Sequence, residues 1–117
     1  MQYALLIYID PEANNGDSEE QRRATTAEYM DLRAKPGMFG GGHLRPVDTA
    51  TTVRVRNGRM SITDGPFAET KEQLAGFYLI EARDLNDAIQ QAAKIPPARE
   101  GSIEVRPVRQ LDPEKYV

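Results

Sequence analysis

The sequence predicts one α+β domain with an antiparallel sheet, in the order strand, helix, strand, hairpin, strand, helix, strand. Three observations support this prediction. Two continuous apolar runs, residues 4–9 and 76–80, have the length and character of central strands covered on both faces. A stretch with apolar residues at helical spacing follows each run. Between them, Asn57-Gly58 is the favoured two-residue turn of a β-hairpin.

The composition excludes several classes of protein. The length of 117 residues fits a single domain over residues 1–117, with residues 108–117 expected as a C-terminal tail. A net charge of −3 argues against a general nucleic-acid binder. Because there is no cysteine and only one histidine, we expect no disulfide and no metal site. We also expect no cofactor. The apolar run at the N-terminus has no basic lead and is too short to span a bilayer, so we expect a cytoplasmic protein without membrane contact.

The first half of the chain contains a strand, a loop and a helix. The run over residues 4–9 ends at Asp10-Pro11, and the polar residues 12–17 are typical of a loop. Ser18 and Gln21 have capping-box spacing and predict the start of a helix, which Lys35-Pro36-Gly37 ends. We expect its buried face to be an apolar stripe of Ala24, Ala27, Met30 and Ala34. A strand over residues 38–44 follows, although its three consecutive glycines weaken it.

The hairpin about Asn57-Gly58 has one apolar and one polar face. Its register places Val55 opposite Met60 and Val53 opposite Ile62. The polar face carries Arg54, Arg56, Arg59, Ser61 and Thr63. The arginines either form an anion-binding patch or keep exposed strands soluble, and the second role is the commoner one.

The second half repeats the strand–helix–strand pattern. Residues 76–80 predict a central strand, Asp84 caps a helix, and residues 102–107 alternate as an edge strand does. The helix has apolar positions at Leu85, Ala88, Ile89 and Ala92 and is stopped by Pro96-Pro97. Without the hairpin the order is βαββαβ, the ferredoxin-like split-βαβ pattern, in which the first and third strands lie in the middle of the sheet. The two apolar runs occupy those two positions.

A sheet of this kind has helices on one face only. An apolar face left open to water is a liability, and the chain offers nothing to cover it. The sequence therefore predicts a homodimer that pairs through the open face of the sheet.

One segment resembles a known family. Residues 64–74, which begin Asp-Gly-Pro-Phe, are similar to the segment that names the DGPF (YCII-related) family. The resemblance continues through residues 76–81 and 101–107, and residues 3–8 and 50–54 also fit. It implies a ferredoxin-like domain that dimerises through its sheet, as in the dimeric α/β-barrel superfamily, which includes lyases, isomerases and cofactor-free oxygenases. It also implies an association with a sigma factor, because genes of this family often lie near genes for extracytoplasmic-function sigma factors.

Two residues are candidates for catalysis. Asp64 comes two positions after Ile62, so strand alternation places it on the apolar face of the hairpin. There it is either a turn-forming residue or an acid with a raised pKa. His43 is the one side chain whose ordinary pKa lies near neutrality, and three glycines precede it. Together they could form a general base with its orienting carboxylate, a pairing that the wider YCII group also implies. The alternative is a histidine with a surface or structural role.

Further residues are candidates for contacting a substrate. They are Arg45, Phe67, Glu69, Lys71 and Tyr78. The charged members of this set are more often a solvated loop face, and Phe67 is expected to fill the core beneath the turn.

Two functional hypotheses follow. The first is a small-molecule site between the sheet and the Asp-Gly-Pro-Phe loop, in an acid–base lyase or isomerase. The second is a non-catalytic dimeric module that binds a ligand or docks a regulatory partner such as a sigma factor. Neither a P-loop nor a G-x-S-x-G nucleophile motif is present.

Overall fold

The predicted order of elements is confirmed. The computed structural model describes residues 1–12 and 18–110, so most of the expected loop over residues 12–17 and the end of the expected tail lie outside it. The elements are β1 (Gln2–Ile9), α1 (Glu19–Arg33), β2 (Met38–His43), η1 (Val47–Thr49), β3 (Thr51–Arg56), β4 (Arg59–Asp64), β5 (Gln73–Glu81), α2 (Leu85–Ala92), η2 (Pro96–Arg99) and β6 (Ser102–Pro107).

Four strands form the main sheet in the order β2-β5-β1-β6, and all neighbours are antiparallel. The two predicted central strands, β1 and β5, are central, while β6 is at an edge as expected. With the hairpin set aside, this order is that of the ferredoxin-like fold, so the predicted fold class is confirmed.

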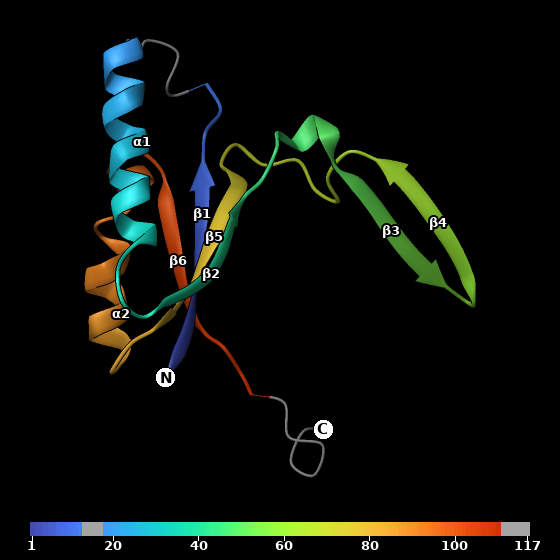
Figure 1. The fold of residues 1–117 in the computed structure, drawn as a ribbon. Coiled ribbons are helices and arrows are strands. Elements are labelled where there is room, and N and C mark those ends of the chain that lie inside the picture. Colours follow the sequence, from blue (N-terminus) through green and yellow to red (C-terminus); the bar gives the residue numbers. More distant parts are fainter. Residues whose placement is uncertain (13–17, 111–117) are drawn as a thin grey trace.

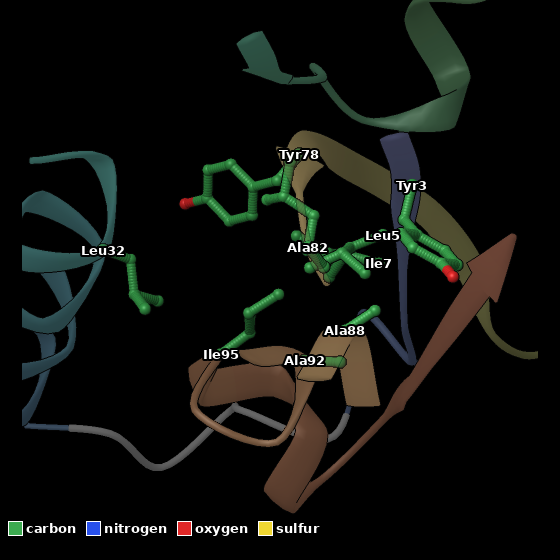
Figure 2. Packing of buried hydrophobic residues seen from close by; sticks show 10 residues of the cluster. Tyr3, Leu5, Ile7, Leu32, Tyr78, Ala82, Ala88, Ala92 and Ile95 are labelled. Carbon is green, nitrogen blue, oxygen red and sulfur yellow. The ribbon is translucent and has the colours of Figure 1, made fainter. Parts of the chain in front are cut away.

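Both α-helices lie on one side of the main sheet (Figure 1). The hydrophobic core lies between the helices and the sheet, and Figure 2 shows its side chains. Alternate residues of the central strands point into it: Tyr3, Leu5 and Ile7 from β1, and Tyr78 and Ile80 from β5. Leu32, Ala82, Ala88, Ala92 and Ile95 complete it. The opposite face of the sheet, the open face, is formed by Ala4, Leu6, Tyr8, Phe77 and Leu79, all of them half-buried.

Side-chain hydrogen bonds at the N-caps begin both helices where the sequence predicts. The Ser18 hydroxyl accepts a hydrogen bond of 3.1 Å from the Gln21 N–H, and the Gln21 side chain accepts one of 2.7 Å from the Ser18 N–H. The Asp84 carboxylate likewise accepts a hydrogen bond of 2.8 Å from the Asp87 N–H. Each cap satisfies backbone donors that the first turn of a helix leaves without partners.

The faces that the helices bury differ from the prediction. The stripe of Ala24, Ala27, Met30 and Ala34 is exposed, and α1 instead turns Tyr29 and Leu32 toward the sheet. Tyr29 and Leu32 are three residues apart and so lie on one side of the helix, where Leu32 joins the buried core and Tyr29 packs against it. In α2, Ala88 and Ala92 are buried as expected, whereas Leu85 and Ile89 are exposed.

Strands β3 and β4 form a separate two-stranded sheet, and we call residues 51–64 the arm. Its register is the predicted one, with Val53 opposite Ile62 and Val55 opposite Met60. Asn57 and Gly58 have φ values of 53° and 74°, as a type I′ turn requires. The arm stands away from the main sheet, on the side opposite the helices (Figure 1).

Candidate functional site

A cavity of about 1040 Å³ lies between α1 and the helix-covered face of the main sheet. Two rows of residues that pair across the strands form its floor. One row joins Ile7, Gly76 and His43, and the next joins Tyr78 and Gly41. The volume is at the upper end of what small-molecule pockets have.

Glycines in the floor let its strands lie close together. At Gly76 a Cβ atom would lie 2.7 Å from the Gly42 carbonyl oxygen. At Gly41, with φ of +154°, a Cβ atom would lie 2.6 Å from the Phe77 carbonyl oxygen and 2.9 Å from the Tyr78 ring. Only glycine therefore lets β2 run so close beside Tyr78.

One side of α1 forms the wall opposite the floor. Its residues recur at helical spacing: Arg22, Thr25, Thr26, Tyr29 and Arg33. Residues 96–101 close one end of the cavity and bring in Arg99. The Arg99 guanidinium donates a hydrogen bond of 2.9 Å to the Glu28 carboxylate and so links η2 to α1.

Two phenols reach into the cavity from opposite sides. Burial, with a contribution from neighbouring Tyr78, raises the pKa of Tyr29 to about 12. Burial also raises the pKa of Tyr78, although nearby Arg33 acts in the opposite direction. Figure 2 shows the Tyr78 ring projecting from the sheet toward the helix that carries Leu32. At neutral pH both phenols are therefore uncharged groups that can donate or accept hydrogen bonds.

The charges around the cavity are mainly positive. Arg22, Arg33 and Arg99 line it together with Asp10 and Glu100. Arginines around an apolar floor suit a small molecule that has an apolar body and an anionic group. Among the described residues, no cluster of three or more histidine and carboxylate groups has an arrangement that could hold a metal ion.

Two of the residues predicted from the sequence line this cavity, namely His43 and Tyr78. His43 is exposed at the end of β2 and shares the covered face of the sheet with Ile7. The other predicted residues lie elsewhere, all of them exposed: Arg45, Asp64, Phe67, Glu69 and Lys71. Asp64 is at the base of the arm, opposite Thr51, and the structure does not bring it into the cavity with His43.

The loop that begins at Asp64 joins the arm to the main sheet. Its turn is held by Gly65, whose N–H donates a hydrogen bond of 2.7 Å to Ala50 and whose carbonyl accepts one of 2.8 Å from the Thr52 hydroxyl. Farther on, the Glu72 carboxylate accepts a hydrogen bond of 2.7 Å from the Ser102 hydroxyl. These contacts give Gly65 and Glu72 structural roles.

The expectation that Phe67 fills the core is wrong, because its side chain is 79% exposed. The loop leaves the base of the arm away from the main sheet, so no core lies beneath it. Phe67 is therefore a large exposed apolar side chain in the loop that follows the arm.

Sequence reasoning missed Tyr29, Arg33 and Arg99. For the two helical residues a signal is present in the sequence. The spacing of Arg22, Thr26, Tyr29 and Arg33 places these residues on one side of α1. Arg99 comes from the short η2 segment, and no local pattern marks it.

Comparison with known proteins gives the family. The model of the YCII-related domain matches residues 1–112. The chain belongs to the YCII-related family. A Rhizobium meliloti (strain 1021) protein, described as uncharacterized, is similar to this YCII-related chain, with 37% identity over 119 residues that cover 97% of this chain and 96% of that protein. The narrower DGPF assignment, which rests on the segment starting at Asp64, stays a prediction.

Within the described part of this YCII-related protein, neither α1 nor α2 combines the length and apolar character that a helix needs to cross a membrane.

Proposed function

We propose that the protein binds a small organic anion with an apolar body in the cavity beneath α1, and that it acts there as an acid–base lyase or isomerase. One observation carries the proposal. A cavity of about 1040 Å³ has an apolar and glycine-lined floor, two uncharged phenols and three arginines around it. Small-molecule sites combine such an apolar interior with a few convergent polar groups.

Each group has a role in this proposal. His43 accepts a proton from a carbon next to the carbonyl of the bound molecule, since imidazole is the side chain that most often serves as a general base. The Tyr78 hydroxyl donates a hydrogen bond to the oxygen on which negative charge then develops. Arg33 pairs with the anionic group of the ligand. Asp64, which does not line the cavity, has no role in this version, and its pairing with His43 stays a prediction.

Deuterium exchange tests the proton transfer whatever product the reaction forms. The protein would be incubated in D₂O with a panel of small carboxylates and lactones, including phenylacetate and γ-butyrolactone, and loss of the α-proton signal followed by NMR. We expect exchange of at least one member of the panel, and we expect His43→Gln to abolish it. Exchange that is equally fast in His43→Gln would remove His43 from the reaction.

Backbone amide shifts locate the binding site in the same samples. Ligand should shift the amides of Gly40, Gly41, Gly42 and Gly76, which form the floor. Arg33→Gln should weaken binding, whereas Arg54→Gln, on the polar face of the arm, serves as the matched control and should not. Shifts confined to residues 64–72 would instead place the ligand at the Asp-Gly-Pro-Phe loop, and an absence of shifts with every member would refute the proposed binding.

We further propose that the protein is a homodimer that pairs through the open face of the main sheet. Support comes from the apolar character of Leu6, Phe77 and Leu79, which no helix covers. A Leu79→Glu variant should be monomeric in sedimentation velocity, while wild type is a dimer at micromolar concentration.

The second candidate function is a non-catalytic module that docks a regulatory protein such as a sigma factor. The exposed apolar face of the arm favours an interaction of this kind. It would be the preferred function if no ligand shifted the cavity amides and a regulatory protein protected the arm.

A further inference from the structure

The apolar face of the arm lacks a partner within the described residues. Its four side chains are highly exposed: Val53 57%, Val55 59%, Met60 66% and Ile62 60%. An isolated two-stranded hairpin is at best marginally stable in water. Ordered strands with one regular apolar face therefore need a second surface to pack against.

The position of the arm indicates where that surface lies. The arm extends on the same side of the main sheet as the open face, away from both helices (Figure 1). The Cα radius of gyration is 16.7 Å, whereas a compact domain of this length has about 13 Å. Within one chain, the arm thus lies on the side of the open face but stands away from it (Figure 1).

Charge favours a second copy as the occupant. The arm contains Arg54, Arg56 and Arg59 but only one acidic residue, Asp64, so its net charge is +2. The rest of the chain must then carry −5, because the whole chain carries −3. The arm of one copy is therefore attracted to the body of another.

The area that a dimer needs also favours the arm. A stable interface buries about 800 Å² on each partner. The open-face residues Leu6, Tyr8 and Phe77 are already half-buried, so they offer limited new area. The arm and the neighbouring Phe67 supply more exposed apolar surface than the sheet does.

We infer that the arm is a clasp, in which the apolar face of β3 and β4 from each copy packs on the body of a second copy. Two-fold symmetry makes the contact reciprocal, so both arms of a dimer are docked, each on the body of the other copy. The inference rests on the homodimer proposed above and adds a second contact surface to it.

A pair of adjacent substitutions tests the clasp. Met60→Glu places a charge on the apolar face of the arm, and Ser61→Glu places the same charge on its polar face. We expect Met60→Glu to raise the dimer dissociation constant, measured by sedimentation velocity, by about tenfold or more, which corresponds to 1.4 kcal/mol. We expect Ser61→Glu to stay within about threefold of wild type.

The outcomes separate the clasp from the homodimer. If wild type and Met60→Glu dimerise equally well, the clasp is refuted and the sheet-mediated homodimer stands. If wild type is a monomer even at high concentration, both are refuted. If Leu79→Glu weakens the dimer while Met60→Glu does not, only the sheet contributes.

Amide hydrogen exchange on wild type gives a second readout that no folding defect can affect. Peptides from residues 51–64 should become protected when the protein concentration is raised through the dissociation constant, because docking restricts local opening of the hairpin. Dimer formation without a change in arm protection would overturn the inference. Protection that arises only when a different protein is added would overturn it too and favour a regulatory partner.

Discussion

At the scale of single residues, burial is the main influence on the pKa values of the cavity phenols. Tyr29 and Tyr78 come from different elements and line the same cavity, where burial disfavours the phenolate. A site built in this way keeps hydrogen-bond donors available over the whole physiological pH range. The proton of either phenol is held more firmly in the folded chain than in the unfolded one.

This difference predicts how stability depends on pH. The pKa of Tyr29 is about 12 in the folded protein, against 10 for an ordinary tyrosine. A group with a raised pKa contributes stability that is complete below the unfolded value and is lost as pH rises through the folded value. The free energy of unfolding should therefore fall between pH 10 and pH 12, measured by urea denaturation at a series of pH values.

The Tyr29→Phe variant is the control for this effect. Because the variant has no phenol at this position, its free energy of unfolding should fall less steeply over the same interval. An identical slope in wild type and variant would show that burial at Tyr29 does not control the loss of stability.

At the scale of elements, the caps are local and therefore predictable from sequence. Ser18, Gln21 and Asp84 act within one turn of the backbone, so their spacing alone places both helix starts correctly. The same holds for Asn57-Gly58, since a two-residue turn fixes the register of the hairpin. Which face of α1 is buried depends instead on the sheet beneath it, and sequence reasoning chose the wrong face.

Replacing Asp84 tests the energetic value of one cap. Asp84→Ala removes the acceptor for the Asp87 N–H at the start of α2 and should lower the free energy of unfolding by about 1 kcal/mol. Asp84→Asn keeps a side-chain oxygen and should retain most of that stability. Urea denaturation at neutral pH measures both variants, and an equal loss in the two would mean that charge, rather than the hydrogen bond, stabilises the helix start.

The candidate site shows the limit of local reasoning. The sequence marks His43 through the glycines before it and places Tyr78 on a predicted central strand. The cavity itself arises where Gly41 and Gly76 from different strands meet the polar side of α1, a juxtaposition that only the fold creates. The loop starting at Asp64 has an unusual composition, yet its described contacts stabilise the base of the arm and the start of β6.

At the scale of the whole molecule, the shape is that of a compact α+β body with a protruding arm (Figure 1). The fold class followed from the order of elements and from the two central apolar strands, which is why sequence alone was sufficient for it. The protrusion of the arm did not follow, because an amphipathic hairpin fits equally well against its own sheet or against another chain.

If the homodimer and its clasp stabilise the fold, thermal stability depends on protein concentration. Association with a partner that binds only the folded state raises the apparent melting temperature by mass action. We expect the melting temperature of wild type to rise between about 1 and about 100 μM, a span of two decades in protein concentration. Met60→Glu should show a smaller rise. Differential scanning calorimetry measures both, and a melting temperature of wild type that is independent of concentration would contradict the prediction.

The arrangement of the central strand has a consequence for synthesis on the ribosome. β1 is made first, but Gln2 pairs with Glu81 and Tyr3 pairs with Pro107, so both neighbours of β1 are made late. At 5–20 residues per second, a chain of this length takes about 10 s to synthesise. The arm can close within about 10 μs of its release because its contacts are local. The apolar β1, in contrast, stays unpaired until β5 and β6 have been synthesised. During this time it is the segment of the nascent chain that most needs binding by a chaperone.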